Sequence, residues 1–148
     1  MAIVGTRRLS PALALLLLAA ACGSGRLAPL PVPLDRVSCS RCGMLVSDGR
    51  TAAQALAAGE EPRFYDDIGC AAADTSLTAA AEIYVSSGDG KWLPAGQAFY
   101  ARAADSRTPM GYGFAAFPSA SAARSRDKDR QALSWTDLTV RIRAGGLR

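Results

Sequence analysis

The uncharged apolar run near the N-terminus decides how much of this chain can form a folded domain. Arg7 and Arg8 precede the run LSPALALLLLAAAC, which is too short to cross a bilayer because a spanning helix needs about 20 apolar residues. A basic start, a short apolar stretch and small residues before a cut are typical of a secretory signal peptide. We therefore expect residues 1–21 to be removed and the fold to be built from the remainder.

Cys22 ends this run in the sequence LAAAC. The arrangement resembles a lipobox, the signal by which bacterial lipoproteins are lipidated on a cysteine that becomes the mature N-terminus. Gly23 follows, with no Asp after the cysteine, and in a Gram-negative cell this implies sorting to the outer membrane. We expect lipidation of Cys22 and anchoring on the periplasmic side of a bacterial membrane, with the outer membrane favoured. The alternative is an ordinary cleaved signal peptide with an unmodified Cys22.

Downstream of Cys22, the composition divides the chain into a tether and one domain. Residues 22–37 hold three prolines and two glycines, which predicts a semi-extended, lipid-anchored tether. Residues 38–143 suffice for a single domain of modest core, and residues 144–148 form a short tail. The mature part carries 15 basic and 13 acidic side chains, because the signal peptide removes two of the 17 Lys and Arg residues. Without a clustered basic face beside stacking aromatics, we expect no nucleic-acid partner.

Residue types and turn signals predict the elements in the first half of the domain. An Asp before an apolar turn can cap a helix, so Asp66 or Asp67 is expected to cap a helix that contains Ile68 and Cys70. The run TAAQALAAG could form a helix by alanine propensity, but the Asp-Gly turn before it favours a strand. The strands expected in this half lie at residues 43–47, 51–59 and 82–87.

The second half of the domain shows a similar order of elements. Strands are expected at residues 97–103, 108–117 and 135–143, and a helix at 118–128 with Pro118 in its first turn. Both halves therefore follow the order strand, strand, helix, strand. This predicts an α+β domain made of two small ββαβ-like units packed together. The aromatic residues expected in its core are Trp92, Phe99, Tyr100 and Trp135.

The chain contains no histidine, which limits the chemistry it can perform. This absence excludes Ser-His-Asp and Cys-His catalysis, c-type haem attachment and Cys2His2 zinc sites. Any metal would be bound by sulfur, carboxylate or backbone groups. The sulfur-bearing candidates are Cys39, Cys42, Met44, Cys70 and Met110.

The pair Cys39 and Cys42 in CSRCGM has four interpretations. A structural disulfide would persist in an oxidising compartment. A thiol–disulfide oxidoreductase would need the first cysteine at a helix N-terminus, but a glycine and strand-forming residues follow Cys42. A structural zinc site would need four N or S ligands, and only three free cysteines remain unless a carboxylate is the fourth ligand. A site of mixed thiolate and thioether ligands would select Cu(I).

Two observations favour the copper interpretation. Met44 follows Cys42 by two residues, so in a strand both side chains share one face. Met110 lies between a proline and a glycine, where a side chain can be aimed rather than packed. Asp66 and Asp67 would be poor Cu(I) ligands, although a carboxylate could hold a harder ion or a partner.

Four segments together resemble the NosL family of lipid-anchored copper-binding proteins, which are associated with the maturation of nitrous oxide reductase. These segments are CSRCGMLVSDGRTAAQ, PRFYDDIGC, EIYVSSGDGKWLPAGQAFYA and TPMGYGFAAF. They carry the motifs Cys-Gly-Met, Phe-x-Asp-Asp-x-Gly-Cys and Thr-Pro-Met-Gly in the family's order. The resemblance covers about residues 38–143 and implies two ββαβ-like units, in agreement with the predicted elements.

The resemblance also implies a function that is not enzymatic. The protein would be a Cu(I) chaperone that receives copper from an exporter or another donor and delivers it to a periplasmic cuproenzyme. It places metal-binding candidates at Cys42, Met44 and Met110, whereas Cys39 and Cys70 belong to a variant of the family with extra cysteines. Those cysteines depart from the members dedicated to nitrous oxide reductase, so another acceptor, such as an oxidase, is open. The alternative function is a thiol–disulfide oxidoreductase that uses Cys39 and Cys42.

Overall fold

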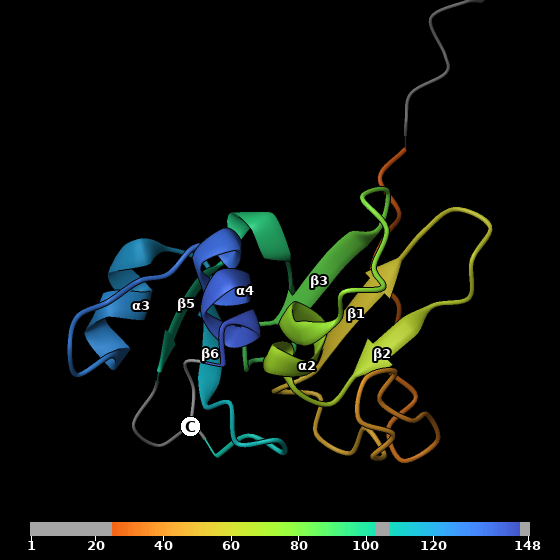
Figure 1. Cartoon of the computed structure of the whole chain (residues 1–148), viewed down its shortest axis with the longest axis horizontal. Coiled ribbons are helices and arrows are strands. Elements are labelled where there is room, and N and C mark those ends of the chain that lie inside the picture. The colour runs from red at the N-terminus through yellow and green to blue at the C-terminus, as the bar shows by residue number, and fades with distance from the viewer. Residues whose placement is uncertain (1–24, 103–106, 146–148) are drawn as a thin grey trace, which may run out of the picture.

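The computed structural model describes residues 25–102 and 107–145, and Figure 1 shows them as strands flanked by helices. The expected signal peptide, residues 1–21, and the expected lipidation site, Cys22, lie outside the described residues. No helix in the described part of the chain is long and apolar enough to span a membrane. The strands and helices confirm the predicted α+β class.

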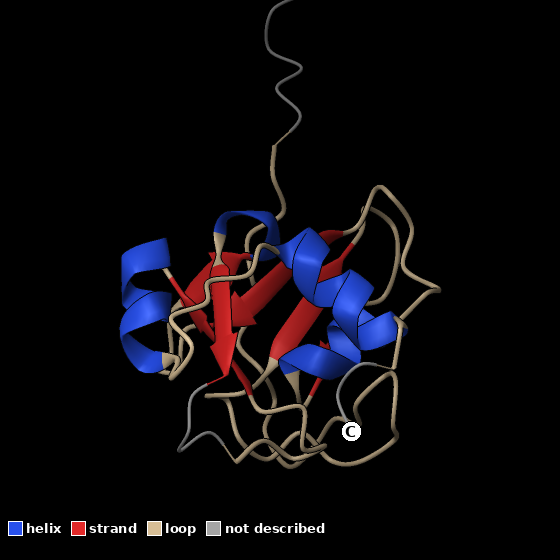
Figure 2. Ribbon diagram, turned by 60° about the vertical axis from the view of Figure 1, so that its left-hand side comes forward, coloured by secondary structure: helices blue, strands red, loops and turns tan. Residues whose placement is uncertain are grey.

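The first half of the domain forms a four-stranded antiparallel sheet in the order β2-β1-β3-β4 (Figures 1 and 2). Its strands are β1 (Ala53–Leu56), β2 (Arg63–Tyr65), β3 (Glu82–Ser86) and β4 (Trp92–Pro94). The alanine-rich run forms the central strand β1, as predicted, and every residue of β1 is buried. Strands on both sides satisfy its backbone groups, and this pairing outweighs the intrinsic preference of alanine for helix.

Helix α2 (Ile68–Ala73) follows β2 and begins where the sequence predicts. The side chain of Asp67 accepts a hydrogen bond from the Gly69 amide at 2.8 Å, so Asp67 is the residue that caps the helix. Because Asp67 caps the helix, the side chain of the neighbouring Asp66 is not needed for capping.

The second half contains the short 3-10 helix η1 (Ala95–Gln97), the antiparallel pair β5 (Phe99–Arg102) and β6 (Phe114–Phe117), and α3 (Ala120–Arg126). Helix α3 packs on β5 and β6. Ser119 caps α3 by accepting a hydrogen bond from the Ala122 amide. Pro118 therefore precedes the cap, and the prediction that it lies in the first turn is wrong.

The last predicted strand, residues 135–143, is wrong, because this segment forms helix α4 (Trp135–Arg143). Ser134 and Asp137 form a capping box, a local signal for helix initiation that the alternation of apolar residues obscured. Leu138 and Ile142 are spaced by one helical turn and are buried, whereas Val140 is 64% exposed. The second half thus has the order ββαα, and only the first half contains the order ββαβ, followed by the additional strand β4.

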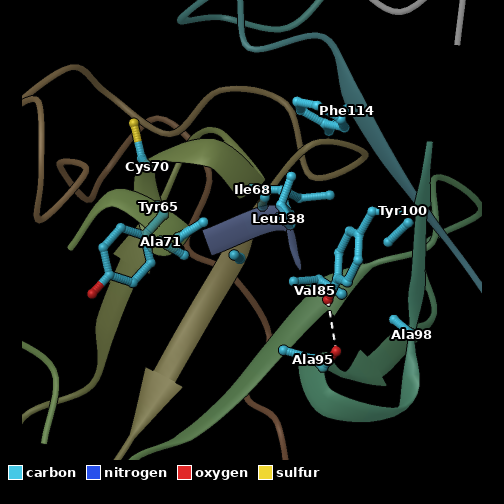
Figure 3. Packing of buried hydrophobic residues seen from close by; sticks show 14 of the residues in the cluster. Tyr65, Ile68, Cys70, Ala71, Val85, Ala95, Ala98, Tyr100, Phe114 and Leu138 are labelled. Carbon is cyan, nitrogen blue, oxygen red and sulfur yellow. Dashed lines mark hydrogen bonds between the residues drawn. The ribbon is translucent and has the colours of Figure 1, made fainter. Parts of the chain in front are cut away.

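The core lies between the sheets and helices α2 and α4, which lie side by side (Figures 1 and 2). Tyr100 is fully buried and donates a hydrogen bond to the Ala95 carbonyl at 2.8 Å (Figure 3). Its ring also contacts the ring of Trp135 at a tilt. Trp92 and Trp135 are only partly buried against this core. The largest fully buried side chains are those of Tyr65, Tyr100, Phe114, Ile68 and Leu138.

Much of the segment predicted as a tether is in contact with the sheet. Gln54, buried on β1, accepts a hydrogen bond from the Leu30 amide at 2.8 Å and donates one to the Leu30 carbonyl at 2.9 Å. The Leu27 carbonyl accepts a hydrogen bond from the Tyr84 hydroxyl at 2.7 Å. From Leu27 onward, this segment is therefore packed on the domain.

Candidate metal centre

The CSRCGM segment forms a tight turn that places Cys39 and Cys42 on one loop. The Gly43 amide donates a hydrogen bond to the Cys39 carbonyl at 2.9 Å, and the Cys39 amide donates one to the Met44 carbonyl at 2.7 Å. Gly43 has φ +79°, a left-handed conformation that favours glycine. The strand predicted at residues 43–47 is wrong, because only Leu45 pairs there, in an isolated bridge with Ser38. Gly43 and Met44 take part in the turn and are therefore not available to form the predicted strand.

Backbone contacts hold this loop against the end of β2. The Ser40 amide donates a hydrogen bond to the Phe64 carbonyl at 2.8 Å. The chain then passes through Asp66, whose carbonyl accepts a hydrogen bond from the Thr51 hydroxyl at 2.9 Å. Helix α2 begins directly afterwards and carries Cys70, whose sulfur points away from Tyr65 and toward the segment that precedes β1 (Figure 3).

Three cysteine sulfurs and one carboxylate meet at this point. One ligand atom each from Cys39, Cys42, Cys70 and Asp66 lie within 4.8 Å of one another, and we call this group the thiol cluster. Cys39, Asp66 and Cys70 are buried, while Cys42 is half-buried, and the three cysteines are free thiols. A group of this composition and spacing could hold a metal ion.

The carboxylate of Asp66 is incompletely satisfied by the protein. Its Oδ1 accepts a hydrogen bond from the Cys42 sulfur at 3.5 Å, but its Oδ2 is buried and has no hydrogen-bond partner. An unpaired buried carboxylate oxygen is unfavourable, because burial removes it from water without compensation. A cation held by the three sulfurs would supply the missing interaction, so the residues fit a bound metal ion.

The three thiols differ in acidity. The pKa of Cys39 falls to about 6, because the Cys70 thiol donates a hydrogen bond to it and this effect exceeds the opposing effect of burial. The same interaction, followed by burial, raises the pKa of Cys70, and burial raises that of Cys42. Cys39 is therefore the most acidic of the three thiols, and metal binding would displace protons from the other two.

The two predicted methionine ligands lie at the surface. Met44 is 49% exposed and Met110 is 42% exposed. The Met44 carbonyl accepts the hydrogen bond from the Cys39 amide, so the backbone of Met44 contacts a member of the thiol cluster. Met110 is tied to the cap of α2, because its amide donates a hydrogen bond to Asp67 Oδ2 at 3.2 Å.

The structure thus brings together the predicted Cys39, Cys42 and Cys70 and adds Asp66, which the sequence analysis considered mainly as a helix cap and did not include among the predicted ligands. The signal that could have identified it is the doubled Asp before IGC. One aspartate is needed for the cap, and the preceding one ends the strand beside the cysteine loop.

No family model matches the chain, and no significant match is found among curated proteins or solved structures. The chemistry of the site therefore follows from its own residues.

Proposed function

We propose that this chain is a membrane-tethered Cu(I)-binding chaperone that delivers copper to a periplasmic cuproenzyme, such as nitrous oxide reductase or an oxidase. The observation that carries this proposal is the convergence of three cysteine sulfurs within 4.8 Å. Cu(I) is a soft ion that binds thiolates strongly, and histidine, the usual competing ligand, is absent. The role is one of binding and delivery, and no catalytic residue is assigned.

A chaperone must also release its metal, and the edge of the site is suited to exchange. Cys42 is half-buried, and Met44 next to its loop is about half exposed. An incoming donor or acceptor could reach this edge and replace one ligand at a time. Met44 and Met110 would then serve as entry or exit ligands for copper.

The other proposed partners follow from the expected lipid on Cys22. Anchoring at the periplasmic side of the outer membrane would keep the domain in the compartment where a copper exporter releases its ion. The acceptor would be met in the same compartment. The thiol cluster would carry the ion between them.

The test is a titration of the full chain, reduced and purified in detergent, with Cu(I) against a competing chelator. We expect one Cu(I) per chain, with affinity lost in Cys42→Ser and in Cys70→Ser. Ser40→Ala is the matched control, since Ser40 lies on the same loop and its amide, not its side chain, makes the contact with β2. Binding that is unchanged in both cysteine variants would overturn the proposal.

A second candidate is a closed zinc site, which the unpaired Asp66 oxygen favours. Zinc accepts carboxylate oxygen together with sulfur in a four-coordinate site, whereas Cu(I) prefers sulfur alone. Replacement of Asp66 by Asn separates the two. For a zinc site, the Asp66→Asn variant should lose Zn(II) affinity, whereas for a copper site its Cu(I) affinity should match that of the unchanged chain.

The oxidoreductase alternative receives less support from the same geometry. Its nucleophile would need to be both acidic and accessible. Cys39 is acidic but only 2% exposed, and Cys42 is more accessible but has a raised pKa. The two requirements fall on different residues, and neither cysteine lies at a helix N-terminus.

A further inference from the structure

The loop of residues 108–113, with the sequence TPMGYG, is fastened to the start of helix α2. Asp67 uses one carboxylate oxygen to cap the helix and the other to accept the Met110 amide. Within the loop, the buried Thr108 accepts hydrogen bonds from the Gly111 amide at its carbonyl and from the Gly113 amide at its hydroxyl, both at 2.9 Å. The loop is therefore held in one shape at the edge of the thiol cluster.

Tyr112, which this loop carries, lies directly on Gly69. A Cβ atom added to Gly69 would come within 2.6 Å of Tyr112 Cβ and still closer to its ring, so that no side chain fits there. Gly69 has no positive φ that would require glycine, so the contact with Tyr112 is what excludes a larger residue. The half-buried ring also packs against the core.

Gly69 directly precedes Cys70 in α2, and Tyr112 packs against the core cluster that contains Cys39 and Cys70. Burial raises the pKa of the Tyr112 hydroxyl. Cys70 itself is only 1% exposed. Cys42, in contrast, is only half-buried.

We propose that Tyr112, seated on Gly69, is a positioning residue that closes the metal centre along α2 and slows the departure of the bound metal. The inference rests on the proposed function, because it assumes that the thiol cluster binds a metal ion. The ring supplies no ligand of its own. It holds the Cys70 side of the site shut, so that metal exchange takes place at the edge formed by Cys42 and Met44.

The first experiment measures how fast the metal leaves. The full chain, reduced in detergent, is loaded with Cu(I), or with Zn(II) in a parallel sample, and mixed rapidly with excess chelator. We expect Tyr112→Ala and Gly69→Ala to release metal about tenfold faster, a change equivalent to ~1.4 kcal/mol in the barrier. Tyr112→Phe should release it at the original rate, because the ring and not the hydroxyl covers the site.

Gly96→Ala is the matched control for Gly69→Ala. Gly96 lies in η1, has no positive φ, and a Cβ atom there would meet nothing within 4 Å. Its release rate should equal that of the unchanged chain. The Tyr112→Ala variant keeps Gly69 and tests the same cover if Gly69→Ala fails to fold.

The second experiment needs no metal. In the reduced, metal-free chain, the rate at which a maleimide modifies Cys70 is followed by mass spectrometry of its peptide, with Cys39 as an internal reference. We expect Tyr112→Ala to speed modification of Cys70 selectively by about tenfold, since the local opening that exposes it becomes easier. A general loss of stability would speed both cysteines alike.

The outcomes separate this inference from the proposed function. Stoichiometric metal binding with the original release rate in Tyr112→Ala would overturn the cover and leave the proposed function standing. No metal binding by the unchanged chain would overturn both. Faster release together with selective exposure of Cys70 would support the cover.

Discussion

The Cys42 thiol donates a hydrogen bond to Oδ1 of Asp66 at 3.5 Å, while Oδ2 of the same carboxylate is buried without a partner. This relationship joins the cysteine loop to the end of β2 and makes Asp66 the least satisfied group in the thiol cluster. A bound cation would convert that unfavourable group into a stabilising one.

Replacement of Asp66 by Asn should therefore have opposite effects in the two metal states. Without metal, the free energy of unfolding should stay level or rise by about 1 kcal/mol, because a buried, incompletely paired charge is removed. With saturating Zn(II), the stabilisation by the metal should shrink. Urea unfolding with and without Zn(II) measures both effects, and the exposed Asp129→Asn serves as control. A large loss of stability in the metal-free protein would show that Asp66 has a structural partner.

The acidity of Cys39 can be checked by the thiolate absorbance of the reduced, metal-free chain. We expect one thiol to ionise with a pKa of about 6, because the Cys70 thiol donates to its thiolate. Cys70→Ala should raise this pKa, since the donor is lost. The folded pKa lies below the unfolded one, so this stabilisation is present above the unfolded value and is lost as pH falls through about 6. A single transition near the ordinary thiol value would contradict the expected contact.

The buried pair of Tyr65 and Asp74 should make the fold sensitive to acid. The Tyr65 hydroxyl donates a hydrogen bond to Asp74 Oδ2 at 2.9 Å. Although burial raises the pKa of Asp74, hydrogen bonds from Ser76 and Tyr65 lower it on balance. Its contribution to stability is thus present above the unfolded pKa and lost as pH falls through the folded one.

Tyr65→Phe should lower the free energy of unfolding at neutral pH by about 1 kcal/mol and reduce this loss in acid. Urea unfolding at neutral and acidic pH provides the measurement. If the unchanged chain and Tyr65→Phe lost the same stability in acid, the hydrogen bond from Tyr65 would not be the cause of the acid sensitivity.

The capping box of α4 should contribute measurably to stability. Ser134→Ala removes the side chain that accepts from the Asp137 amide at 3.1 Å and should cost about 1 kcal/mol. The loss reaches the whole domain, because α4 buries Leu138 in the core. Thr136→Ala, on the exposed face of the same helix, should change little. Thermal unfolding of both variants tests the difference.

Lipidation of Cys22 is tested in a bacterial host with labelled palmitate. We expect label on the unchanged chain, none on Cys22→Ser, and label retained by Cys39→Ser, because only Cys22 follows the apolar run of the signal peptide. Label that persists in Cys22→Ser would show that Cys22 is not the lipidation site.

Local signals were sufficient for part of the fold. The cap at Asp67, the strand that became β1 and the strand that became β3 depend on neighbours in the sequence, and each formed where it was predicted. The prediction of a strand at residues 135–143 was wrong because alternating apolar and β-branched residues are also typical of a strand. In this segment the helical spacing of Leu138 and Ile142, together with the capping box, prevails once α4 packs on the core.

By itself, the sequence determined which side chains could bind a metal: the cysteines, three of which lie downstream of Cys22, with no histidine to compete. It also placed Cys39 and Cys42 together, because two residues between them and Gly43 after them permit a tight turn. Only the tertiary structure decided that Cys70 and Asp66 complete the group, since that depends on docking of the cysteine loop on the end of β2. Long-range contacts of this kind leave no periodic pattern in the sequence, so Asp66, considered mainly as a helix cap, was not identified as the fourth candidate ligand.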